Sequence, residues 1–118
     1  MKTIEEKNRM ISEFMGYETY EHTNSISIRI TEGNEFNSSD IGHVHTKFHT
    51  SWDWLMPVIE KIERLGFTVE KNFQPIDNDW QCLVVKGNDI LFQEFNEQSI
   101  QAMHYVVVEF IEMYNQKN

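Results

Sequence analysis

The chain has 118 residues, which is the length of one domain and is too short for two of ordinary size. An apolar share of 40%, with 8 Phe, 4 Tyr and 3 Trp, is enough for a hydrophobic core and excludes a disordered chain. The balance of 10 basic against 19 acidic residues gives a net charge of −9, which disfavours binding to nucleic acid.

The first predicted element is a helix from Thr3 to Met15. Thr3 and Glu6 have the spacing of a capping box, in which each residue satisfies a backbone amide of the other. Apolar residues then recur at helical spacing, and Gly16 supplies the left-handed residue that ends a helix.

A β-region is predicted after this helix. Residues 17–20 are consistent with a short strand, and residues 24–31 alternate as a half-buried strand does. The core face of that second strand carries three isoleucines, Ile26, Ile28 and Ile30. Residues 32–48 are polar and are predicted to form a long loop or insertion, a length that is often functional in a compact domain.

A strongly amphipathic helix is predicted from Thr50 to Phe67. Thr50 and Asp53 have capping-box spacing, and Gly66 is expected to end the helix. Pro57 lacks an amide and predicts a bend or a late start to the regular helix. The predicted core stripe consists of Trp52, Leu55, Val58, Ile59, Ile62 and Leu65.

The C-terminal half is predicted to contain three strands and a helix. Residues 67–73 form one strand, and residues 80–86 and 90–95 form a hairpin around a tight turn at 87–89. A final helix begins at Asn96 or Ser99 and runs to about Tyr114. The fold class is therefore α+β: a single domain over residues 1–118, with an antiparallel or mixed sheet of about four strands packed with three helices.

A histidine cluster gives the sequence its candidate metal site. His43, His45 and His49 share one side of an extended chain, and Asp40 lies nearby as a fourth ligand. Three histidines with one open position are the ligand set of catalytic zinc. Lys47 shares that side and argues against a metal, and exposed histidines in a loop would have the same spacing.

The helix start offers a second candidate site, Trp52-Asp53-Trp54. Adjacent residues on a helix point about 100° apart, so Trp52 is expected in the core and Trp54 is expected to be partly exposed. An exposed tryptophan there could bind a ligand or a protein partner, or could cover the edge of the core. Cys82, the one cysteine, lies in an apolar strand and is expected to be a buried small hydrophobe, not a nucleophile.

Three pieces of the sequence carry a resemblance: F-M-G-Y at 14–17, H-T-S-W-D-W-L-M-P-V-I-E-K-I-E at 49–63, and V-V-E-F-I-E-M-Y-N at 107–115. They resemble small uncharacterised proteins encoded by phages and prophages of Bacteroidetes-type bacteria, and the arrangement is similar to the phage αβα sandwich domain family. The resemblance implies the fold and a phage or prophage origin. It brings no activity and no catalytic residue, and residues 22–47 have no counterpart in it.

These observations favour a non-enzymatic phage or prophage accessory protein that acts as a binding module for a host or phage protein or a small ligand. The expected site is His43, His45, His49, Trp52, Asp53 and Trp54, and no cofactor is expected. The alternative is a zinc-binding protein or metal-dependent hydrolase that uses the histidine cluster. Mimicry of DNA by the acidic surface is a third hypothesis. No signal peptide or membrane span is recognised, so a cytoplasmic location is expected, and a homo-oligomer is possible.

Overall fold

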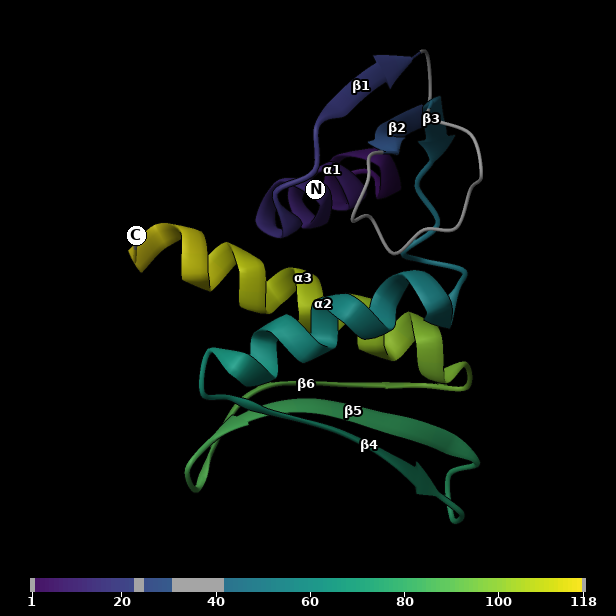
Figure 1. Cartoon of the computed structure of the whole chain (residues 1–118). Coiled ribbons are helices and arrows are strands. Elements are labelled where there is room, and N and C mark those ends of the chain that lie inside the picture. Colours follow the sequence, from purple (N-terminus) through teal and green to yellow (C-terminus); the bar gives the residue numbers. More distant parts are fainter. Residues whose placement is uncertain (1, 23–24, 31–41, 118) are drawn as a thin grey trace.

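The computed structural model describes residues 2–22, 25–30 and 42–117 (Figure 1). It confirms the predicted α+β class. The elements follow in the order α1 (Ile4–Met15), β1 (Thr19–His22), β2 (Ser25–Ile30), β3 (Gly42–His45), α2 (Trp52–Arg64), β4 (Thr68–Gln74), β5 (Asp79–Lys86), β6 (Asp89–Asn96) and α3 (Ser99–Lys117). None of the described helices is long and apolar enough to cross a membrane.

The strands are divided between two sheets, in place of the single sheet of about four strands that we expected. Each sheet has three antiparallel strands, in the orders β1-β2-β3 and β4-β5-β6. The additional strand, β3, lies in the segment predicted to be a loop, where it pairs Val44 with Ile28 of β2. A four-residue polar strand has too few apolar residues for its alternation to be recognised, so its pairing partner decides its conformation.

Two of the helices, α2 and α3, form the middle layer of the molecule (Figure 1). Figure 1 shows α2 and α3 side by side over one face of β4-β5-β6, with α1 and the smaller sheet on the far side of these helices. Aromatic rings join the layers at one end of the core. Phe110 of α3 packs edge-on against Phe14 of α1 at 6.2 Å and against Phe67, next to β4, at 4.7 Å between ring centroids.

Local signals set the ends of the first two helices. The Thr3 side chain accepts a hydrogen bond from the Glu6 amide at 3.1 Å, and Gly16 and Gly66 have positive φ of 82° and 102°. The N-cap of α2 is Ser51, so the prediction of Thr50 was wrong. The amides of Thr50 and Ser51 both bond to the carbonyl of Lys47, so a turn ahead of the helix already holds Thr50.

The two neighbouring tryptophans have burial opposite to our prediction. Trp54 is 7% exposed and packs edge-on against Phe48, with 5.1 Å between ring centroids. Trp52 is half-buried, and the Lys71 ammonium lies 5.0 Å from its ring centroid. The segment ahead of α2 places Phe48 in the core beside Trp54. Phe48 lies outside the helix, so the periodicity of the helix could not predict this contact. Pro57 is buried inside α2, which continues to Arg64.

The C-terminal half follows the sequence closely. The hairpin pairs β5 with β6, and a bulge lies between Val84 and Val85. The core face of β5 includes Cys82 and Val84, both fully buried as the apolar run predicted. The last helix extends to Lys117, three residues beyond the predicted Tyr114, since its polar final turn gives no periodic signal.

Candidate functional site

The core contains buried polar residues on two helices. Asn8 of α1 is 1% exposed and His104 of α3 is 5% exposed, and among the described residues only Ser12 and Thr46 are other buried polar side chains. Both residues lie on the buried faces of their helices: Asn8 is three residues before the buried Ile11, and His104 is one turn before the buried Val108. Buried polar side chains of this kind need hydrogen-bond partners to offset the cost of leaving water.

The Asn8 side chain bridges two histidines. Its Nδ2 lies 2.9 Å from Nδ1 of His49, and its Oδ1 lies 2.9 Å from Nε2 of His104. An amide nitrogen only donates and an amide oxygen only accepts, so His49 accepts at Nδ1 and His104 donates from Nε2. These roles fix one neutral tautomer for each ring, which leaves the proton of His49 on Nε2 and the lone pair of His104 on Nδ1.

The neutral state of His104 has an electrostatic cause. Burial is the largest cause that lowers the pKa of His104 to about 4, and electrostatic interactions with His49 and Lys7 act in the same direction. His104 is therefore uncharged at neutral pH. The hydrogen bond to Asn8 oxygen does not need an imidazolium, and the chain His49–Asn8–His104 is stable without a buried net charge.

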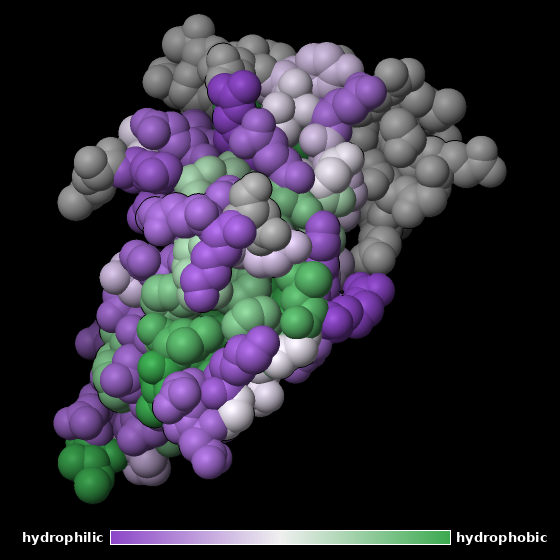
Figure 2. All heavy atoms as spheres, turned by 90° about the vertical axis from the view of Figure 1, so that its left-hand side faces the viewer, coloured by the Kyte–Doolittle hydropathy of each residue, from purple (hydrophilic) through white to green (hydrophobic). Residues whose placement is uncertain are grey.

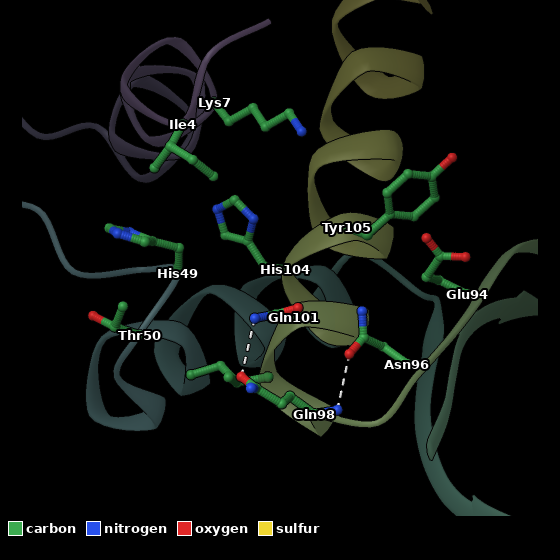
Figure 3. Close-up of a pocket in the computed structure, with 11 residues that line it drawn as sticks. Ile4, Lys7, His49, Thr50, Glu94, Asn96, Gln98, Gln101, His104 and Tyr105 are labelled. Atoms are coloured by element: carbon green, nitrogen blue, oxygen red, sulfur yellow. Dashed lines mark hydrogen bonds between the residues drawn. The ribbon is translucent and has the colours of Figure 1, made fainter. Parts of the chain in front are cut away.

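A cavity of about 460 Å³ lies beside the hydrogen-bonded side chains of His49, Asn8 and His104. This volume falls in the range of about 300–1,000 Å³ that is usual for small-molecule sites. Figure 3 shows Lys7 and Ile4 on the α1 side, His104 and Tyr105 on α3, and Glu94 on β6. The complete lining is Ile4, Lys7, His49, Thr50, Glu94, Asn96, Gln98, Ile100, Gln101, His104 and Tyr105.

Most of the polar lining has fixed hydrogen bonds. Asn96 Oδ1 accepts a hydrogen bond from the backbone N–H of Gln98 at 2.9 Å, and Gln101 Nε2 donates to Oε1 of the Gln98 side chain at 3.0 Å (Figure 3). These bonds hold three side-chain amides at the start of α3. A second cavity of about 200 Å³ lies toward the smaller sheet, and it shares Ile4 and His49 with the first. His49 thus stands in the wall between two cavities.

The structure brings together only part of the predicted site. His49 and His45 both line the smaller cavity, and His49 also lines the larger one. Asp40 and the side chain of His43 lie outside the described part of the chain. Within residues 2–22, 25–30 and 42–117, no group of three His, Cys, Asp or Glu side chains is placed to hold a metal ion.

The predicted tryptophan site and the cavity are separate. Neither Trp52, Asp53 nor Trp54 lines either of the two cavities beside His49. Sequence reasoning missed Lys7, Asn8, Glu94 and His104 altogether. A signal was present for two of them, since an asparagine and a histidine at core positions of amphipathic helices are unusual enough to prompt a search for their partners.

Cys82 is the one cysteine, and its surroundings disfavour reactivity. Its side chain is fully buried, and its sulfur lies 3.6 Å from the carbonyl oxygen of Ser99. Burial raises the pKa of the thiol to about 11, against an opposing effect of the Lys71 ammonium. The thiol is therefore protonated at neutral pH, which agrees with the predicted role as a small core residue.

Comparison with known proteins adds no family to this description. No family model, no curated protein and no solved structure matches the chain.

Proposed function

We propose that this protein is a non-enzymatic binding module that holds a small polar ligand in the cavity between α1, α3 and β6. The observation that supports the proposal most strongly is the hydrogen-bonded chain His49–Asn8–His104 at the wall of that cavity. It joins three segments that are distant in sequence. It also fixes the tautomer of both imidazoles, so that each presents a defined donor or acceptor.

A purely structural role accounts less well for this chain of polar groups. Apolar residues of similar volume at positions 8 and 104 would avoid the desolvation of an amide and an imidazole, and such replacements are often neutral or stabilising. Binding sites commonly combine an apolar wall with a few oriented polar groups. The cavity has that composition, because Ile4 and Ile100 line it together with the fixed amides of Asn96, Gln98 and Gln101.

A cavity-filling variant tests the proposal. We expect ligand-observed NMR with a library of small polar molecules to give binders for the natural protein. Gln101→Trp places a large ring in the cavity and should weaken those binders at least tenfold. Gln116→Trp is the matched control, since it puts the same change on an exposed position of the same helix. Absence of any binder sensitive to Gln101→Trp contradicts the proposal.

The resemblance to phage and prophage proteins suggests the setting of this binding: an accessory protein in the cytoplasm of a bacterial host. A host or phage protein is the alternative partner. Crosslinking in infected or induced cells, followed by identification of the crosslinked species, tests this setting. If one protein is recovered and its crosslinks lie away from the cavity residues, the result would favour a protein partner over a small ligand.

A further inference from the structure

The cavity is lined by one charged residue of each sign. These are Lys7 on α1 and Glu94 on β6, and Figure 3 shows the Lys7 side chain extending toward α3 and Glu94 lying beside Tyr105 of that helix. Among the described residues, neither the Lys7 ammonium nor the Glu94 carboxylate has an ion-pair partner within 4.0 Å, and they do not pair with each other. Within the described part of the chain, the Glu94 carboxylate accepts one hydrogen bond, from the backbone N–H of Phe95 at 3.3 Å.

The rest of the lining adds no charge. His104 is neutral near pH 7, and the remaining polar side chains are amides, hydroxyls and the His49 ring, whose Nδ1 accepts from Asn8. Charges of opposite sign held apart across a half-enclosed space favour a ligand that carries both complementary charges. A ligand with one charge would satisfy one wall and leave the charge on the other wall partly desolvated and without a partner.

We propose that the ligand of this cavity is a small zwitterion of the amino-acid class, with its carboxylate at Lys7 and its ammonium at Glu94. The inference rests on the proposed function, because it names the ligand class of the same site. Each contact is a charge-assisted hydrogen bond in a site partly screened from water, where such bonds are stronger than on an open surface.

A series of ω-amino acids tests the ligand class directly. Glycine, β-alanine, 4-aminobutyrate and 6-aminohexanoate present the same two charges at increasing separation. We expect one member to bind best in calorimetric titrations, and we expect it to bind more tightly than either butyrate or butylamine, which each carry one of its charges. Equal binding of the zwitterion and of the two singly charged molecules would overturn the inference.

Variants assign the two contacts. Lys7→Met and Glu94→Gln should each lower the affinity for the best zwitterion about 10- to 100-fold, the usual range for a lost hydrogen bond to a charged group. Lys7→Met should also abolish the preference over butylamine, and Glu94→Gln the preference over butyrate. Lys2→Met and Glu97→Gln are the matched controls, since both residues are exposed and neither lines the cavity.

The charge-exchanged double variant provides a second readout. Lys7→Glu with Glu94→Lys keeps one charge of each sign in the cavity lining with their positions exchanged, so zwitterion binding should recover relative to either reversal alone. If the cavity binds small polar molecules in a manner sensitive to Gln101→Trp but without preference for zwitterions, the inference fails and the proposed function stands. If no such molecule binds, both fail.

Discussion

Oδ1 of Asn8 accepts a hydrogen bond from Nε2 of His104 at 2.9 Å, across a separation of 96 residues in the sequence. This bond connects the first helix with the last one inside the core. Through Nδ2, the same amide reaches His49 in the turn ahead of α2. One side chain therefore ties together three parts of the chain at the wall of the candidate site.

Removal of the Asn8 amide should destabilise the fold. Asn8→Ala leaves the buried nitrogen of His104 and Nδ1 of His49 without their partner, so we expect the free energy of unfolding to fall by about 2–4 kcal/mol. Asn115→Ala, an exposed change on α3, should alter it by less than about 0.5 kcal/mol. Urea denaturation followed by circular dichroism measures both. Equal effects would show that the amide bridge contributes nothing.

The stability of the protein should depend on pH through His104. Its folded pKa of about 4 lies below the ordinary value of 6.5, so the unfolded chain binds the additional proton as the pH falls. The stabilisation is present above pH 6.5 and is lost progressively between pH 6.5 and pH 4, by about 3 kcal/mol in all. His104→Gln should remove this part of the pH dependence. An unchanged pH profile in the variant would contradict the assignment.

The thiol of Cys82 should react slowly with disulfide reagents in the folded protein. A pKa raised by burial from 9.0 to about 11 lowers the thiolate fraction at pH 8 about 100-fold, and burial also blocks access. We expect full reactivity in denaturant, measured by the colour change of an aromatic disulfide. Rapid labelling under native conditions, at the rate found in denaturant, would mean that β5 opens readily.

The two tryptophans at the start of α2 should differ in their contribution to stability. Trp54→Ala empties a buried position beside Phe48 and should cost about 3–5 kcal/mol. Trp52→Ala removes a half-buried ring and its contact with the Lys71 ammonium, and it should cost less than half as much. Thermal or urea unfolding of both variants distinguishes them. A larger loss for Trp52→Ala would restore the assignment that periodicity suggested.

Local chemistry explains which elements could be predicted. The cap at Thr3 and the left-handed glycines at Gly16 and Gly66 act through atoms a few residues away, so the chain contains the whole signal within one turn. Burial was also predictable in the strands. The alternation that includes Ile26 and Ile28 and the apolar run around Cys82 predict buried side chains, and all three are buried in the structure. The N-cap of α2 was predicted one residue too early, because the backbone N–H of Thr50 already bonds to the carbonyl of Lys47 in the preceding turn.

The candidate site could be predicted only in part. The polar run between the first two helices pointed to His49, which does lie at the junction of two cavities. Its partners come from α1 and α3, and no spacing rule connects residues 8, 49 and 104. The expected convergence of His43, His45 and His49 with Asp40 depends on residues that lie partly outside the described chain, so this metal site stays a prediction.

The sequence by itself determined the fold class, the three amphipathic helices, the C-terminal hairpin and the burial of Cys82, because periodicity, caps and turns act over short separations. Only the tertiary structure decided which tryptophan is buried, that residues 42–45 form a strand, and that Asn8 bridges His49 and His104 beside a cavity. Those features depend on contacts between distant segments, and such contacts exist only after the helices and sheets have packed.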